Sequence, residues 1–271
     1  MATKSGWGAR FLGALGHTPV QACSYLGQLV LLGCEVLYSL FAARIRWKLV
    51  RIQIVEIGAR SQSVVSVTGA FTGAVFAAQT FFQFNRVGME SAVGAVVAVS
   101  MCRELGPVLT GLMLAGRVGA SMTAEIGTMK VTEQIDALRT MSVHPVDYLV
   151  TPRMLAILIA MPILTAESIA LGIGTAYLVG VQVLGIEAAY YIDNMMTFTD
   201  GRDIAMGLIK GMVFGQLIGV ISCHQGLNTT NGAVGVGRAT TTAVVYASLA
   251  ILIVNFFLTM TLNMFIPAGR S

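Results

Sequence analysis

Two adjacent charges, Arg103 and Glu104, interrupt a long apolar stretch of the sequence. A guanidinium can bind a phosphate through two parallel hydrogen bonds, and a carboxylate can hold a proton or a cation. Lys210 and Arg238 are further cations in or beside apolar stretches, where they could meet the same phosphate. Two interpretations stay open: Arg103 and Glu104 compensate each other beside a kink at Pro107, or they line a polar pocket for a phospholipid headgroup.

Other residue types that carry chemistry do not form a site in this sequence. His17, His144 and His224 are scattered without metal-ligand spacing, and the four cysteines lie far apart without a Cys-x-x-Cys pair. No serine or threonine is accompanied by a recognisable base and acid. The glycine-rich residues 232–237 lack the Gly-Lys-Ser/Thr ending of an ATP-binding P-loop. We therefore expect neither enzymatic activity nor a metal or cofactor in this chain.

The composition indicates that a bilayer is the solvent of the chain. Of its 271 residues, 55% are hydrophobic and 11% are charged, whereas soluble domains carry about a quarter charged residues. The mean hydropathy is +0.77. The formal net charge of +4 is not accompanied by a basic surface with interleaved aromatic residues, so nucleic acid is excluded as a partner.

The apolar stretches predict an all-α membrane protein with about five transmembrane helices and one N-terminal interfacial helix. Residues 1–52 form the N-terminal unit, in which an amphipathic helix over about 19–41 would lie in the interface, with Arg44, Arg46 and Lys48 at headgroup level. A true crossing is the alternative there. Residues 53–271 form the transmembrane unit, whose spans are expected at about 53–82, 89–122, 154–184, 204–222 and 243–266.

The distribution of charge orients these spans. Basic residues cluster before the first span, and Lys130, Arg139 and Arg238 lie in two of the connecting segments, whereas residues 185–203 hold four acidic residues and one arginine. Positive charge marks the cytoplasmic side of membrane proteins. We therefore expect a multi-pass protein of the bacterial inner membrane with a cytoplasmic N-terminus, and a cytoplasmic loop over residues 224–242.

Small and polar residues within the spans favour packing roles. Glycines at positions 207, 211, 215 and 219 share one stripe of a helix, which allows close approach by another helix within or between protomers. Glu167 is expected to be a hydrogen-bond partner within the bundle, in preference to a proton relay.

A short amphipathic helix is predicted between the second and third spans, over about residues 130–142. Val131, Ile135 and Leu138 share one face, and Thr132 is expected to be its N-cap. This apolar stripe needs a partner surface. Either it packs against the chain's own bundle, or it fits a groove on another protein.

The run from Cys102 to Met141, CRELGPVLTGLMLAGRVGASMTAEIGTMKVTEQIDALRTM, together with GVGRATT at 235–241, resembles the MlaE (also called YrbE) permease family. The resemblance covers most of the chain. It implies a homodimeric phospholipid permease that binds a cytoplasmic ABC ATPase carrying ATP and magnesium. It further implies a periplasmic MCE-domain hexamer as a partner, and leaves room for a small STAS-domain protein.

The resemblance also assigns roles to residues. It favours a lipid path that includes Arg103, Glu104, Lys210 and Arg238. It makes the short cytoplasmic helix a coupling helix that contacts the ATPase through Glu125, Lys130, Glu133, Ile135, Leu138 and Arg139. Aspartate at position 135 or 138 should then abolish co-purification of the ATPase, and alanine at 103 or 104 should stop lipid transfer without unfolding the protein.

Other functions stay open from the sequence. An ion-coupled secondary transporter of a hydrophobic anion would use Glu104 or Glu167 as its ion site and need no ATPase. A structural anchor would need Arg103 and Glu104 for assembly but not for transport. Within the permease interpretation, a sterol or another hydrophobic molecule is an alternative cargo.

Overall fold

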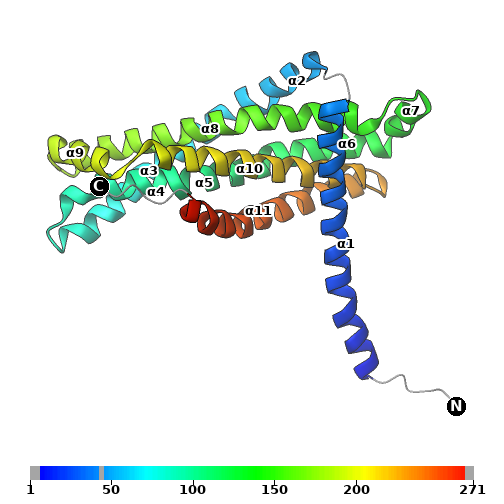
Figure 1. Ribbon diagram of the computed structural model, residues 1–271, viewed down its shortest axis with the longest axis horizontal. Coiled ribbons are helices and arrows are strands. Elements are labelled where there is room, and N and C mark those ends of the chain that lie inside the picture. The colour runs from blue at the N-terminus through cyan, green and yellow to red at the C-terminus, as the bar shows by residue number, and fades with distance from the viewer. Residues whose placement is uncertain (1–6, 43–45, 266–271) are drawn as a thin grey trace.

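The computed structural model describes residues 7–42 and 46–265, and all regular structure in these ranges is helical (Figure 1). The helices are α1 (Trp7–Ala42), α2 (Trp47–Ile54), η1 (Val55–Ala59), α3 (Gln62–Asn85), η2 (Glu90–Ala92), α4 (Val93–Ser100), η3 (Met101–Leu105), α5 (Gly106–Leu114), η4 (Ala115–Gly119), α6 (Ala120–Val131), α7 (Gln134–Thr140), η5 (Val146–Val150), α8 (Thr151–Leu178), η6 (Val179–Val183), α9 (Ala188–Phe198), α10 (Gly201–Leu227) and α11 (Gly232–Phe265). The predicted all-α membrane fold is confirmed.

Five helical paths are long and apolar enough to cross a membrane, as predicted. They are Trp47–Asn85, Glu90–Val131, Val146–Val183, Gly201–Leu227 and Gly232–Phe265, and contain 39, 42, 38, 27 and 34 residues. A helix of 42 residues measures about 63 Å, whereas the hydrocarbon core of a bilayer is about 30 Å thick. The longest paths therefore project well beyond a membrane.

The long helices run side by side between two ends of the bundle (Figure 1). We call these the α7 end and the α9 end, after the short helices that lie there. The path through η2, α4, η3, α5, η4 and α6 runs continuously from the α9 end to the α7 end.

The expected cytoplasmic loop over 224–242 is wrong. Helix α10 continues to Leu227 and α11 begins at Gly232, so residues 228–231 alone connect them. Residues 224–242 contain no proline that would interrupt a helix, and α11 packs along α6. The second span, which was expected to end at about residue 122, also continues as a helix up to Val131, because residues such as Ile126 are buried in the core. Tertiary packing therefore makes α6 and α11 longer than the apolar stretches of the sequence indicated.

Helix α1 crosses the bundle near the α7 end, nearly at right angles to the long helices (Figure 1). It packs against α8, α10 and η5. The expected N-terminal helix is thus present, and a crossing angle of this kind suits a helix that lies in a membrane interface. The division of the chain after residue 52 stays a prediction, and Arg44 falls outside the described residues.

Glycines bring the backbones of the central helices into contact. A Cβ atom at Gly73 of α3 would lie 2.0 Å from the carbonyl oxygen of Gly172 on α8, and one at Gly207 of α10 would lie 2.2 Å from that of Cys102. The other stripe positions of α10 face side chains of α8. The glycine stripe therefore serves close packing within the chain, one of the two packing roles predicted for it.

Candidate functional site

Arg103 and Glu104 lie on η3, a π-helical turn that directly precedes Pro107. Proline has no backbone N–H, so it cannot pair with the carbonyl four residues earlier, which belongs to Arg103. The Nζ of Lys210 donates to this carbonyl oxygen at 2.8 Å. Pro107 therefore leaves the Arg103 carbonyl free to accept a hydrogen bond from Lys210, a buried cation on α10.

Lys210 is completely enclosed by the protein, with a side chain that is 0% exposed. Besides the Arg103 carbonyl, its ammonium donates to Glu104 Oε1 at 2.7 Å and to Thr259 Oγ1 at 2.8 Å. An ammonium has three N–H donors, and the protein accepts all three. Lys210 was expected to meet a phosphate, but in this structure it has no donor left for one.

Glu104 is held by three donors from two other helices. In addition to Lys210, Thr259 donates to Oε1 at 3.0 Å and Asn255 donates to Oε2 at 2.9 Å. Asn255 and Thr259 are one turn apart on α11, so they approach the carboxylate from the same side. The side chain of Glu104 remains 37% exposed.

Arg103 pairs with Asp203 at the start of α10. The Nε of Arg103 donates to Asp203 Oδ1 at 2.6 Å, and a weaker contact of 3.4 Å reaches Asn263 of α11. Asp203 is 3% exposed and also accepts from the Asp200 backbone N–H within a capping box of α10. Of the two interpretations left open, the one in which Arg103 and Glu104 compensate each other is wrong, because each of them has a partner on α10.

These four residues, Arg103, Glu104, Asp203 and Lys210, form what we call the four-charge cluster. Its formal charge is zero, and its members are held by Asn255 and Thr259. At 1.5 Å per residue, Arg103 lies about 20 Å along its helical path from Glu90 and about 42 Å from Val131. The cluster thus sits toward the α9 end of the bundle.

Arg238 does not belong to the cluster. It lies on α11, about 26 Å along the helix axis from Asn255, toward the opposite end of the bundle. Its side chain is exposed, and no ion pair or hydrogen bond of Arg238 occurs among residues 7–42 and 46–265. Arg238 and Arg103 are therefore far apart, and the structure does not support the expectation that they share one lipid path.

Sequence reasoning missed Asp203, Asn255 and Thr259 as parts of this site. Asp203 was assigned to an external acidic segment, although the spacing Asp200-x-x-Asp203 is typical of a capping box. Asn255 and Thr259, with Asn263 one further turn on, form a polar stripe within an otherwise apolar helix. Such a stripe indicates a polar partner inside the bundle.

The cluster is suited to binding and orientation. Every formal charge in it has a partner of the opposite sign, while Arg103 and Glu104 keep part of their surface free, 22% and 37%. Across the part of the chain that the structure describes, no three His, Cys, Asp or Glu side chains gather to hold a metal ion.

The segment predicted as a helix over 130–142 consists of two helices. Lys130 and Val131 end α6, and α7 spans Gln134–Thr140. Thr132 was expected to cap α7, but its hydroxyl donates to the Thr128 carbonyl at 2.8 Å. The N-cap position is occupied by Glu133 in a left-handed conformation, with φ of 61°. The predicted N-cap is therefore wrong.

The apolar stripe of α7 faces the chain's own core. Ile135 is 0% exposed, and Leu138 is partly buried against the same core. The expectation that Ile135 offers its side chain to another protein is wrong, because the bundle itself covers it. On the opposite side, Glu133 and Arg139 are exposed. Asp136 joins Lys130 and Arg139 at 3.1 Å and 3.2 Å.

Two further acidic residues have defined partners. Glu125, which was expected to contact an ATPase, is half exposed and binds Arg153 of α8 at 2.8 Å. Glu167 of α8 accepts a hydrogen bond from Ser66 of α3. The expected role of Glu167 as a hydrogen-bond partner within the bundle is confirmed.

Comparisons with known proteins place this helical bundle in a family. The family model "Permease MlaE" matches residues 50–261. A probable ABC transporter permease protein of Rickettsia conorii is 44% identical over 246 residues, which cover 91% of this chain and 95% of that protein. One from Synechocystis sp. is 41% identical over 83% of this chain and 85% of its own.

A plant protein is also similar. The chloroplastic protein TRIGALACTOSYLDIACYLGLYCEROL 1 of Arabidopsis thaliana is 38% identical over 224 residues, which cover 83% of this chain and 64% of the plant protein. The long apolar helices and the extent of these matches agree. This chain belongs to the MlaE permease family and is a multi-pass permease subunit of the ABC transporter type.

Proposed function

We propose that this chain is the permease subunit of an ATP-driven phospholipid transporter that moves lipid between the inner membrane and a periplasmic MCE-domain carrier. The observation that carries the proposal is the four-charge cluster, a polar site enclosed by helices of membrane-crossing length. Charged residues at such positions are costly in a membrane and commonly mark a substrate path.

The chemistry of the cluster fits a phospholipid headgroup. Arg103 presents part of a guanidinium, which suits a phosphate, and Glu104 presents part of a carboxylate, which suits an ammonium. A site with both signs and no net charge matches a headgroup with both signs. The similar Arabidopsis protein is named after a diacylglycerol lipid, which supports a lipid cargo.

The charges at the two ends support an orientation with the α7 end in the cytoplasm. Basic residues of α2 and of the α6–α7 segment lie at the α7 end, whereas Glu90, Glu187, Asp193 and Asp200 lie around the α9 end. This arrangement satisfies the positive-inside rule. The N-terminus would then be cytoplasmic and the cluster would lie in the periplasmic half of the membrane.

The exposed side of α7 is the proposed contact for the ATPase that an ABC permease requires. Glu133, Arg139 and Met141 are exposed there, Met141 to 72%. Lys130 and Asp136 stiffen this surface through their ion pair. Ile135 and Leu138 would transmit movement inward, because they join α7 to the core.

Helix α11 is the proposed face for a second copy of the chain. In its most apolar window 17% of the residues are buried, compared with 50% in α10. The polar stripe that holds Glu104 lies on this same helix. A homodimer that packs along α11 would place two clusters around one path, below the proposed MCE-domain hexamer. A small STAS-domain protein would be a further cytoplasmic partner.

The partners of the two candidate ion-site residues count against an ion-coupled secondary transporter. Glu104 is paired with a buried lysine, and Glu167 is bonded to Ser66. Membership of an ABC permease family favours ATP as the energy source.

Lipid transfer in a reconstituted system tests the cargo and the energy source together. The permease, its ATPase and the MCE-domain protein would be placed in vesicles with fluorescent phospholipid. We expect transfer that needs ATP hydrolysis and that falls at least about 10-fold in Arg103→Gln/Asp203→Asn, which removes both charges but keeps the hydrogen-bonding groups. Arg86→Gln, an exposed arginine at the same end, is the control. Undiminished transfer by the double variant would contradict the proposal.

Co-purification tests the coupling surface. Met141→Asp should release the ATPase while the permease remains folded, because Met141 is exposed and adjoins α7. Met89→Asp, at the other end of the bundle, is the matched control, since Met89 is 55% exposed. Retention of the ATPase by Met141→Asp, or its loss from Met89→Asp, would rule out this surface.

A further inference from the structure

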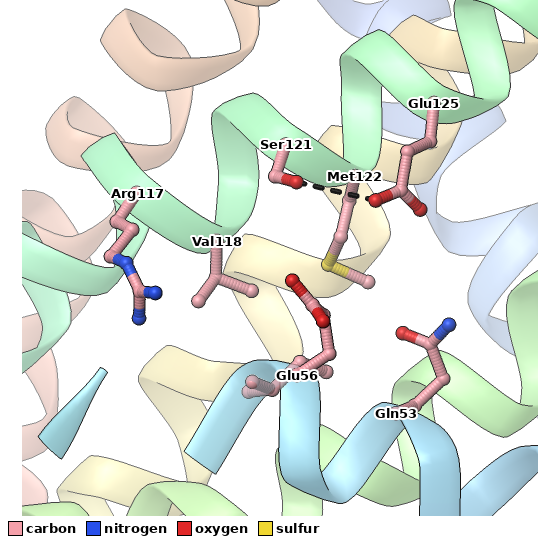
Figure 2. Close-up of a pocket in the computed structure, with 8 residues that line it drawn as sticks. Gln53, Glu56, Arg117, Val118, Ser121, Met122 and Glu125 are labelled. Atoms are coloured by element: carbon pink, nitrogen blue, oxygen red, sulfur yellow. Dashed lines mark hydrogen bonds between the residues drawn. The ribbon is translucent and has the colours of Figure 1, made fainter. Parts of the chain in front are cut away.

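A second polar site lies between the four-charge cluster and the α7 end. It is a cavity of about 90 Å³ between the α2–η1 segment and the η4–α6 segment. Figure 2 shows Gln53 and Glu56 on one side of it, opposite Arg117, Ser121, Met122 and Glu125 on the other. A cavity of this size holds a few water molecules or a phosphate group, and it is too small for a whole lipid.

The position of this Arg117 cavity relative to a membrane follows from α3. This helix has 24 residues without a formal charge, about 36 Å, and is flanked by Arg60 and Arg86. A length of this kind matches the hydrocarbon core, so both arginines fall at headgroup level. Arg117 donates to Ser61, the residue next to Arg60, at 2.6 Å. Arg117 therefore lies at the same headgroup level, at the α7-end border of the hydrocarbon.

Two π-helical turns aim polar side chains into the cavity. Glu56 belongs to η1 and Arg117 belongs to η4, just as Arg103 and Glu104 of the other site belong to η3. Single π-turns within α-helices frequently occur at functional sites. The long second helix thus carries one such turn at each of its two polar sites.

The charges around the cavity do not balance. Glu56 accepts from Arg60 at 2.6 Å, and Glu125 accepts from Arg153 at 2.8 Å, so both carboxylates have an arginine of their own. Arg117 has the hydroxyl of Ser61 as its hydrogen-bond partner, and within the described residues it forms no ion pair. Three arginines are thus present for two carboxylates, and the positive charge without a carboxylate partner is that of Arg117, whose side chain is half-buried.

We propose that the Arg117 cavity binds the phosphate of an anionic phospholipid headgroup from the adjacent leaflet, with Arg117 as the binding residue. A guanidinium presents five donors in a planar fork, and one bond to Ser61 leaves donors for a phosphate. The lipid's acyl chains stay in the bilayer beside α3, since the cavity admits the phosphate alone. This site depends on α3 crossing the membrane and not on the transport step proposed above.

Photo-crosslinking of the isolated full-length chain tests this site without any ATPase. The chain is reconstituted in phosphatidylcholine vesicles that contain a phosphatidylglycerol analogue with a diazirine on its headgroup. We expect labels on residues 53–61 and 117–125, and a loss of about 10-fold in Arg117→Gln, which can still bond Ser61. Arg117→Lys should keep most of the label. Glu56→Gln should raise it, because a repelling charge is removed.

Arg60→Gln is the matched control, since Arg60 is a neighbouring but exposed arginine with its own carboxylate. It should change labelling less than about 2-fold, in line with the small energy of an exposed ion pair. Unchanged labelling in Arg117→Gln overturns the proposal. So does equal labelling by a diacylglycerol analogue, which lacks phosphate, or by a phosphatidylcholine analogue, which has no net charge. Displacement by excess inorganic phosphate would show a free-anion site, and would also overturn it. Failure of lipid transfer with this labelling intact would count against the transport function alone.

Discussion

The four-charge cluster and the Arg117 cavity lie about 21 Å apart along one continuous helical path, yet they handle charge in opposite ways. In the cluster, two cations meet two carboxylates, and Lys210 and Asp203 are almost completely buried. In the cavity, the carboxylates are about 40% exposed and are already paired, which leaves Arg117 with a hydroxyl.

This difference separates two uses of a charged residue at membrane depth. Burial makes each member of a balanced cluster dependent on its partner, because an unpaired buried charge is very unfavourable. A cation at the membrane border can instead keep its charge available, since water and headgroups solvate it. We therefore expect substitutions in the cluster to affect folding strongly and substitutions around the cavity to affect it weakly.

The largest effect is expected for Glu104→Ala. It leaves the ammonium of Lys210 buried without a counter-charge, and removal of one partner from a buried pair costs about 3–5 kcal/mol. Thermal unfolding of the purified protein in detergent would show the loss. The earlier expectation that this variant keeps its fold is thereby revised.

Glu104→Gln/Lys210→Met is the control for that prediction. Both charges are removed together, so most of the stability should return. A double variant as unstable as Glu104→Ala would show that the carboxylate acts through Asn255 and Thr259 and not through Lys210.

A somewhat smaller effect is expected for Arg103→Ala. Asp203 would lose its charged donor while keeping the backbone N–H of Asp200, a loss of about 2–3 kcal/mol. Unfolding in denaturant measures it. An unchanged midpoint would show that water or Asn263 replaces the guanidinium, and the cluster would then be less closed than the structure indicates.

Glu125→Gln should have a moderate effect, of about 1.5 kcal/mol, because Arg153 is 9% exposed but Glu125 is 46% exposed. The amide can still accept from the guanidinium. The same unfolding experiment applies. A loss as large as that of Glu104→Ala would remove the distinction between the two regions.

Arg60→Gln should have the smallest effect, within about 0.5 kcal/mol. Its ion pair with Glu56 joins residues four apart on the surface, with side chains 64% and 38% exposed. Raising the salt concentration should shrink this small difference between the variant and the wild type further, because salt screens exposed ion pairs. A marked destabilisation would mean that Arg60 also supports the cavity wall.

The sequence was sufficient for the five spans, because a window of apolar residues determines whether a helix can cross a membrane. It was not sufficient for the ends of these helices. Residues 232–242 are polar enough to suggest a loop, and their packing along α6 makes them helical. The same limitation applies to the apolar stripe that contains Ile135. The sequence showed the stripe, but only the tertiary structure shows that the chain's own core covers it.

The sequence identified several residues of the candidate site, but it did not identify the residues with which they pair. Arg103, Glu104 and Lys210 were singled out because charges are rare in apolar stretches, and the structure brings them together. Their partners, Asp203, Asn255 and Thr259, are about 100 or more residues away from the Arg103–Glu104 pair. No local pattern sets which helix faces which, so pairing by sequence proximity gave the wrong partner for Arg103.

The backbone contact between Gly73 and Gly172 has a mechanical consequence. Where two helices touch without intervening side chains, neither can slide along the other without the atoms colliding, and tilting one would open a void in the hydrocarbon. Any conformational change that preserves this contact must move α3 and α8 together as one rigid body. Motion between two states of the protein then occurs where other helices pack against this pair.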